Sequence, residues 1–407
     1  MTIPAEFTPD AIDAASTDAF APYSAFHTSG EPYRSMIRHN PWMRPPGPKD
    51  ELVWGEGRYY DTTVGRKHPG WKDKDLPRET KDINQLRRDF YAWGYCLIAD
   101  GLSAEQCARL RERVVDQAAA ERALGIAHLS AAQQHVWALV NKSDEVVACM
   151  EHDPAAVQAG PLIERLLDEA LGEGWHHLSF ISNISFPGCH PQGLHQDQSL
   201  IAPYVTPQAP VLINTVYILQ DVDEVNGGTL LIPGSHRANG DNGETFGPLP
   251  RAINLEARAG TILLMDGRVL HGGAVNRSDK LRYILTNTVV RPWIRQQEEF
   301  LLTIRPEVLA GASEKFLMRC GFQSTAGRSM VEGYGYVGTG RTGDPNGALV
   351  HVRRAIDHGG YAYVGPLSMA DVGRIDPEAF TGVKIQRGHE TYRNDGYLKR
   401  LADITAL

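Results

Sequence analysis

The first hydrophobic pattern along the chain is helical. Between residues 82 and 172, apolar positions recur three and four residues apart, which is the spacing of one buried helix face. Ser103, with Gln106 three residues later, forms a capping box at the start of one such segment. The expected helices cover 82–93, 103–123 and 161–171. We therefore predict a mainly helical region, interrupted by a short strand at 95–98.

From residue 176 to residue 293 the pattern changes to short apolar runs rich in Val, Ile, Thr and Leu. Gly, Pro and Asn separate these runs, as expected for strands joined by turns. The expected strands cover 178–184, 211–219, 228–232, 260–264 and 281–290. Strand and helix do not alternate here, as they would in a nucleotide-binding α/β fold. The pattern predicts an antiparallel barrel or sandwich.

Two extensions flank this core. Residues 1–80 are rich in Pro, which excludes regular helix, and in aromatic residues, which argue against simple disorder. We expect this N-terminal extension to wrap the main domain or to cover a site as a lid. Residues 81–293 form the predicted core, and residues 294–407 a C-terminal extension packed on it. The Gly-rich stretch 330–341 lacks the strand-to-helix setting of a phosphate-binding motif.

Composition narrows the class of protein. The chain has 407 residues, 42% hydrophobic and 22% charged, which is typical of a globular protein with a sizeable core. Its net charge of −8 comes without a Lys/Arg block, so nucleic acid is not an expected partner. The five cysteines are odd in number and form no CxxC pair, which favours a reducing compartment. No segment approaches the roughly 18 apolar residues of a membrane span, and we expect a cytoplasmic protein without membrane association.

Candidate chemistry concentrates on three residues of the strand-rich region. His195 and Asp197 lie two positions apart, so an extended backbone would turn both side chains to one face. His271 follows a strand signal and begins a Gly-Gly turn. Two imidazoles and one carboxylate form a facial ligand set for a divalent metal, which in iron oxygenases leaves positions open for a co-substrate and O₂. The sequence therefore predicts a metal site at these three residues.

Other interpretations of the histidines stay open at this point. An HxD pair alone is a weak signal, because a surface pair of His195 with its acid would look the same. His190 lies in a nearby loop and could replace His195, but no carboxylate follows it two residues later. His176 and His177 are adjacent and would face opposite sides of a strand. His236 closes a turn, where a structural hydrogen bond is the simpler role.

Arg282 adds a second component to the site. It lies in the apolar run 281–290, on the same side as Ile284, Thr286 and Thr288. A buried arginine requires a counter-anion, and its guanidinium pairs with a carboxylate through two parallel hydrogen bonds. A bound 2-oxo-diacid would meet this need, with its keto-acid end on the metal and its far carboxylate on Arg282. We expect Thr286 or Thr288 to assist.

Four blocks of sequence, in this order, resemble the phytanoyl-CoA dioxygenase family of iron(II)- and 2-oxoglutarate-dependent oxygenases. The blocks are 194–197, 219–236, 260–266 and 271–282. The resemblance implies a mainly β protein with flanking helices, built on a double-stranded β-helix (jelly-roll, cupin-like) core. It also implies that iron(II) binds to His195, Asp197 and His271, and that 2-oxoglutarate binds to Arg282.

The resemblance also suggests outer contacts to the co-substrate. In this family a strand residue before the HxD motif and the residue inside it often touch 2-oxoglutarate, and Asn183 and Gln196 occupy about these positions. Two features depart from the family pattern. Residues 214–216 stand where an aromatic residue is common, and residues 272–273 stand where Ser or Thr is common. The presence of Asp197 argues against halogenation, because halogenating relatives replace this ligand with a small residue.

The sequence therefore predicts a dioxygenase that uses iron(II), 2-oxoglutarate and O₂. We expect it to hydroxylate, or otherwise oxidise, an unactivated C–H bond of a small organic metabolite, with release of succinate and CO₂. Substrate contacts are expected from 198–204, Arg291 and Trp293, and nothing in the sequence specifies an oligomeric state. Two alternatives remain: an iron dioxygenase on a cupin-like barrel without 2-oxoglutarate, and a non-catalytic ligand-binding barrel.

Overall fold

The computed structural model describes residues 71–322, with short gaps, and three later segments. The gaps are 131–132, 188, 190–191, 193–194, 201–208, 238–251, 275 and 277, and the later segments are 329–331, 335–337 and 365–375. Of the predicted N-terminal extension, only residues 71–80 are described. The expected lid, His190 and most of the Gly-rich stretch lie outside the described residues.

The larger of two facing sheets has eight strands, and its order shows that sequence neighbours are often separated in space. In spatial order the strands are β1 (Glu79–Thr80), β2 (Tyr95–Ile98), β9 (Ile262–Asp266), β6 (Leu212–Ile218), β11 (Arg282–Val290), β5 (His176–Ser185), β4 (Gln133–His135) and β3 (His128–Ser130). All neighbours pair antiparallel except β1 with β2.

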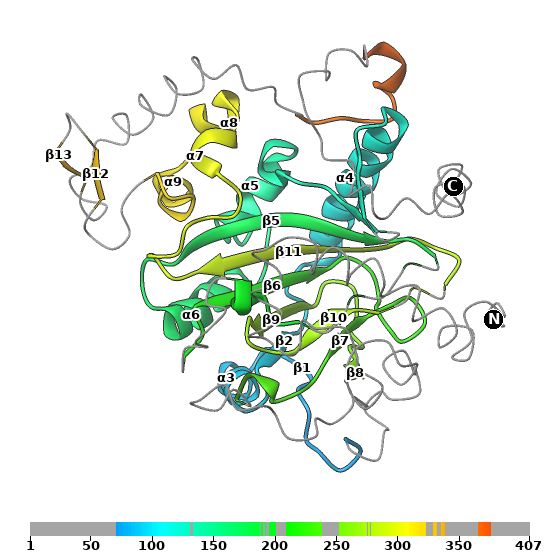
Figure 1. Ribbon diagram of the computed structural model, residues 1–407, viewed down its shortest axis with the longest axis vertical. Coiled ribbons are helices and arrows are strands. Elements are labelled where there is room, and N and C mark those ends of the chain that lie inside the picture. Colours follow the sequence, from blue (N-terminus) through cyan, green and yellow to red (C-terminus); the bar gives the residue numbers. More distant parts are fainter. Residues whose placement is uncertain are drawn as a thin grey trace, which may run out of the picture.

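The smaller sheet contains β10 (His271–Gly273), β7 (Thr229–Leu231) and β8 (Ile253–Asn254), in that order. Figure 1 shows these strands gathered on one side of the larger sheet. Alternate residues of β9 separate two cores: Leu263 and Met265 face the smaller sheet, whereas Ile262 and Leu264 pack with the helices. This arrangement of two antiparallel sheets is the double-stranded β-helix, so the predicted fold class is confirmed.

Helices cover the outer face of the larger sheet (Figure 1). They are α3 (Ile83–Trp93), α4 (Ala104–Ala123), α5 (Asp144–Met150), α6 (Gly160–Leu171), α7 (Phe300–Thr303), α8 (Pro306–Ala310) and α9 (Glu314–Arg319). The predicted capping box is present, because Ser103 and Gln106 each bond the other's backbone. In the part of the chain that is described, no helix combines the length and apolarity needed to cross a membrane.

The sequence prediction missed two strands, β3 and β4, within the region expected to be helical. The hairpin of β3 and β4 lies in the region expected to be helical, apart from one strand at 95–98. Its residues Gln133, Gln134 and His135 are polar and show no apolar alternation, and β4 forms because it pairs with β5. His271 was expected to begin a turn. It is instead the first residue of strand β10, which pairs with β7.

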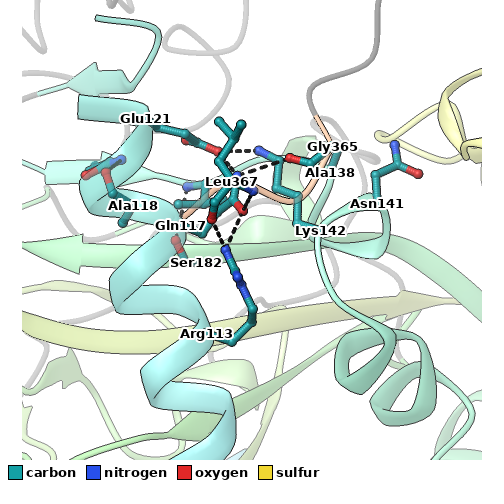
Figure 2. A network of polar contacts seen from close by, with 12 residues as sticks. Arg113, Gln117, Ala118, Glu121, Ala138, Asn141, Lys142, Ser182, Gly365 and Leu367 are labelled. Atoms are coloured by element: carbon teal, nitrogen blue, oxygen red, sulfur yellow. Dashed lines mark hydrogen bonds and ion pairs between the residues drawn. The ribbon is translucent and has the colours of Figure 1, made fainter. Parts of the chain in front are cut away.

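A late segment of the chain returns to the surface of α4. Figure 2 shows Gln117 and Arg113 of α4 bound to the backbone of residues 365–367. The Leu367 N–H donates to Oε1 of Gln117 at 2.8 Å, and the Leu367 carbonyl accepts from Arg113. Beneath this contact, Nζ of Lys142 lies 2.6 Å from Oε1 of Glu121, and both side chains are buried. The segment is thus attached to the helical side of the sheet.

Candidate active site

The three predicted ligands converge because two distant segments form a short antiparallel bridge. The His195 N–H donates to the His271 carbonyl at 2.9 Å, and the His271 N–H donates back at 3.0 Å. His271 is the first residue of β10, and Asp197 begins a short 3-10 helix over Asp197–Leu200. The bridge places the two imidazole rings 4.6 Å apart between their centroids.

The side chains of His195, Asp197 and His271 are close enough to hold one metal ion. Nε2 of His195 lies 3.2 Å from Oδ1 of Asp197, and Nε2 of His271 lies 3.4 Å from Oδ2. One ligand atom from each residue lies within 4.8 Å of the others. Nδ1–H of His271 donates to the Val269 carbonyl at 3.0 Å, so Nε2 is the ring nitrogen that faces the cluster. This donor set fits the facial triad of a non-haem iron site.

The charge state of Asp197 suits a metal ligand. Burial alone would raise the pKa of its carboxyl group. The charge of His271 and hydrogen bonds from both histidines outweigh burial and hold this pKa well below its usual range. Asp197 is therefore a carboxylate at neutral pH, and its negative charge is available to a cation.

Side chains from two neighbouring strands fix the carboxylate of Asp197. Nδ2 of Asn214, on β6, donates to Oδ2 of Asp197 at 2.6 Å. The hydroxyl of Thr288, on β11, donates to Oδ1 of the same amide at 2.8 Å. The register pairs Asn214 with Thr288, so the two residues are neighbours by strand pairing. Asn214 and Thr288 are buried, and together they hold one oxygen of Asp197 in place.

The predicted co-substrate residue Gln196 lies elsewhere. Its side-chain amide donates to the carbonyl of Arg268, in the turn between β9 and β10. The Arg268 guanidinium in turn pairs with the buried carboxylate of Asp266. Gln196 is not among the residues that line the cavity next to the triad. Its contacts attach the ligand-bearing loop to the β9–β10 turn.

A cavity of about 480 Å³ opens beside the triad, between the two sheets. Alternate residues of β11 form one wall of it: Arg282, Ile284, Thr286 and Thr288. The predicted residues Asn183 and Thr286 also line the cavity. The metal ligands and Arg282 therefore face one common space.

Arg282 is the most unusual side chain in this cavity. It is only 2% exposed, and one nitrogen, Nη2, donates to the Ser185 hydroxyl at 2.7 Å. Nε and Nη1 have no hydrogen-bond partner among the residues described. Burial lowers the pKa of Arg282 to about 10, so the guanidinium remains charged at neutral pH. A buried cation with unsatisfied N–H groups on a cavity wall is a site for an anion.

Sequence reasoning missed two further lining residues, His135 and Trp137. Their rings are 5.9 Å apart between centroids. Nδ1–H of His135 donates to the Ser182 carbonyl at 3.2 Å. Burial, with the charges of His128 and Arg282, lowers the pKa of His135 to about 4, so the ring is neutral. These residues were not identified because the strand that carries His135 has no apolar pattern.

Residues 90–284 match the family described as phytanoyl-CoA dioxygenase (PhyH). Curated relatives include the dioxygenase aneA of Aspergillus aculeatus, 30% identical over 34% of this chain and 49% of that protein. The Fe(II)/2-oxoglutarate-dependent dioxygenase nvfF of Aspergillus novofumigatus is 32% identical over 28% of this chain and 38% of that protein. The chain spans about half, or less, of the length of these relatives.

Two solved structures are similar to this chain over a little more than half of its length. One is the non-haem α-ketoglutarate-dependent epimerase SnoN of nogalamycin biosynthesis, with a TM-score of 0.42 and 19% identity over 57% of this chain and 91% of that one. Another is HygX of Streptomyces hygroscopicus with nickel, 2-oxoglutarate and hygromycin B bound, with a TM-score of 0.41 and 14% identity. That match covers 52% of this chain and 88% of HygX.

Proposed function

We propose that the chain is an iron(II)- and 2-oxoglutarate-dependent dioxygenase of the phytanoyl-CoA dioxygenase family, which residues 90–284 match. One observation supports this activity above all: a buried arginine with unpartnered N–H groups lines the same cavity as a His–Asp–His cluster. A metal site alone would fit many enzymes. A metal site facing a buried cation fits a co-substrate that has a chelating end and an anionic end.

His195, Asp197 and His271 would hold the iron. Their three donor atoms leave the remaining coordination positions to other ligands. Asp197 occupies the carboxylate position, so no coordination position would be left open for a halide. We therefore assign oxidation without halogenation. When iron and 2-oxoglutarate are bound, they supply the oxidising power from O₂, with succinate and CO₂ as the co-products.

Arg282 would bind the far carboxylate of 2-oxoglutarate. The second N–H of Nη2, together with the free N–H of either Nε or Nη1, can form two parallel hydrogen bonds to it, while the other N–H of Nη2 keeps its bond to Ser185. This pairing would also remove the cost of a buried, unpaired guanidinium. Thr286 and Asn183 line the cavity, and the Thr286 hydroxyl and Oδ1 of Asn183 would be available to the body of the co-substrate, whereas Nδ2 of Asn183 donates to Gln133.

The surrounding residues would position the reacting groups and exclude water. Asn214 and Thr288 hold Asp197, and the bridge between His195 and His271 fixes the two rings. The substrate class we propose is a small organic molecule with an unactivated C–H bond. The protein's part is to orient that carbon near the metal, whereas the oxidising chemistry belongs to the metal and co-substrate.

The test is an anaerobic titration of the protein with Fe(II) and then 2-oxoglutarate, recorded by visible absorption. A chelated keto acid on ferrous iron gives a weak charge-transfer band. We expect this band in the wild type, its loss in His195→Ala, and a weaker affinity for 2-oxoglutarate in Arg282→Ala. Arg258→Ala is the control, because Arg258 pairs with Glu79 at the surface and does not line the cavity.

Two outcomes would reject this proposal. Iron binding without the band, at any concentration of 2-oxoglutarate, would favour an iron dioxygenase that does not use this co-substrate. Absence of stoichiometric iron binding would favour a non-catalytic ligand-binding barrel.

A further inference from the structure

We propose that the substrate is an amphipathic acid, with an apolar body beside the metal and a carboxylate bound by Arg295 at the cavity mouth. This inference rests on the proposed function and extends it to the substrate class. It follows from a difference in chemistry between the two ends of the cavity along strand β11.

The strand register gives the position of each component along β11. Arg282 begins the strand and lies opposite Ser185, so the anion site is at that end. Thr288 lies near the other end, and it contacts the metal ligand Asp197 through Asn214. A co-substrate that reaches from Arg282 to the metal would therefore lie along residues 282–288. The cavity beyond Thr288 is left for the substrate.

The part of the cavity beyond Thr288 has an apolar floor. Leu178 and Leu212 line it, and they pack with Val290 and Ile294 in a small cluster separate from the two main cores. Leucine side chains at this position offer contact to hydrocarbon and no hydrogen bonds. A substrate body placed here would be apolar, next to the metal and away from the charged end.

The mouth of this part carries a cation. Arg295 and Gln297 line it, on the segment that follows β11. Backbone bonds hold this segment against β5, because the N–H groups of Gln297 and Glu298 donate to the Leu178 carbonyl at 3.1 and 3.0 Å. Arg295 is therefore kept beside the apolar floor.

Arg295 is available to an anion. Its present partner is Glu299, four residues later, and the two side chains are 83% and 42% exposed. An ion pair so exposed contributes little and exchanges easily. Among the described residues that line the cavity, Asp197 is the only carboxylate, and the metal would engage it. The charged lining residue at the substrate end is thus Arg295, a cation.

The experiment compares probes that share one hydrocarbon chain and differ in the head group: dodecanoate, dodecanol, dodecylamine and dodecanoyl-CoA. Each is titrated under nitrogen into protein loaded with Fe(II) and 2-oxoglutarate, and binding is followed by calorimetry and by the change in the charge-transfer band. We expect dodecanoate to bind about fivefold to tenfold more tightly than dodecanol, as for a partly exposed charged hydrogen bond.

Variants link this preference to Arg295. Arg295→Gln should abolish the preference for the acid without changing the affinity for 2-oxoglutarate, and Arg295→Glu should transfer it to dodecylamine. Arg165→Gln is the matched control, because Arg165 forms the same type of exposed pair with a glutamate four residues later on α6. It should leave all affinities unchanged.

The results separate this proposal from the one on which it rests. If the charge-transfer band never forms, the dioxygenase assignment fails before any probe is added, and the substrate class fails with it. If the band forms normally, four results would overturn the substrate class alone. These are equal binding of acid and alcohol, a preference that survives in Arg295→Gln, binding of the CoA thioester only, and no binding of any probe.

Discussion

Asn214 is the residue whose role is most sharply defined by its contacts. Its amide spans 2.6 Å to Asp197 and 2.8 Å to the Thr288 hydroxyl, so it can fix the orientation of the carboxylate. We predict that Asn214→Ala weakens metal binding by about 10-fold to 100-fold, as for other outer-shell partners of metal ligands. Titration with Co(II), followed by its visible spectrum, measures this affinity without catalysis.

The matched control is Thr288→Val, which removes only the bond that orients the amide. It should weaken metal binding less than Asn214→Ala does. Equal metal affinity in wild type and Asn214→Ala would show that Asp197 needs no such support.

Arg282 illustrates a conflict between stability and function. Without an anion, its guanidinium is buried with Ser185 as its hydrogen-bond partner and with two nitrogens unpaired among the described residues. Replacing a poorly paired buried charge by an apolar chain of similar length often stabilises a protein. We predict that Arg282→Met raises the free energy of unfolding by about 1 to 3 kcal/mol in urea denaturation without 2-oxoglutarate.

Addition of 2-oxoglutarate with metal should reverse this order. The wild type should gain stability with rising concentration of the ligand, because only the folded state binds it. Arg282→Met should gain much less. A variant that is less stable than the wild type without ligand would show that the guanidinium is already well satisfied.

At the scale of secondary-structure elements, the strands predicted most accurately from the sequence are those that are buried and apolar along their length. The expected strands over 178–184, 211–219 and 281–290 correspond to β5, β6 and β11, because both faces of these strands are buried and their runs are apolar. Arg282 was predictable for the same reason, since it interrupts an apolar strand. By contrast, β4 is polar and exists through its pairing with β5, which is a tertiary contact.

The side chains that support Asp197 were not predictable either. Asn214 acts on Asp197 because the register places it beside Thr288, and the register depends on pairing between strands far apart in sequence. The three residues of the cluster, which we propose as ligands, were predictable from residue type and spacing. The residues that orient them were not, because nothing in the chain marks which polar group in a strand will face the cavity.

The outer face of β5 predicts a dependence of stability on pH. His177 is fully buried there, and its Nε2 lies 2.9 Å from the Met150 carbonyl. Burial, reinforced by the charge of His152, lowers the pKa of His177 from 6.5 to about 3. The unfolded chain therefore binds a proton at this residue below pH 6.5, whereas the folded chain does not until about pH 3.

It follows that the free energy of unfolding falls as the pH falls through 6.5. We expect His177 to account for a loss on the order of 1 kcal/mol between pH 7.5 and about pH 5.5. Urea denaturation at both pH values, in the wild type and in His177→Gln, measures it. The variant should lose less stability than the wild type over this interval, and an equal loss would exclude His177 as the cause.

At the scale of the whole molecule, the two faces of the larger sheet differ in role: the helical face contributes stability, and the other face lines the cavity. Helix α4 and the segment over residues 365–371 meet on the outer face of the larger sheet, and Figure 2 shows Arg113 and Gln117 beside Gly365 and Leu367. The buried pair of Lys142 with Glu121 lies at the centre of this contact, and Gln117 donates to the same carboxylate oxygen at 3.0 Å. These contacts stabilise the sheet from behind.

Removing one member of that pair should therefore reduce stability without changing the site. Lys142→Met leaves the Glu121 carboxylate buried beside Gln117 alone among its described partners, and we predict a loss of about 3 to 5 kcal/mol in the free energy of unfolding. The double variant Lys142→Met with Glu121→Leu should recover most of this loss, because no unpaired charge remains.

In both variants the folded protein should bind 2-oxoglutarate with wild-type affinity below the unfolding transition. A large change in that affinity would show that the pair on the outer face of the sheet and the cavity on its inner face are coupled through the strands between them.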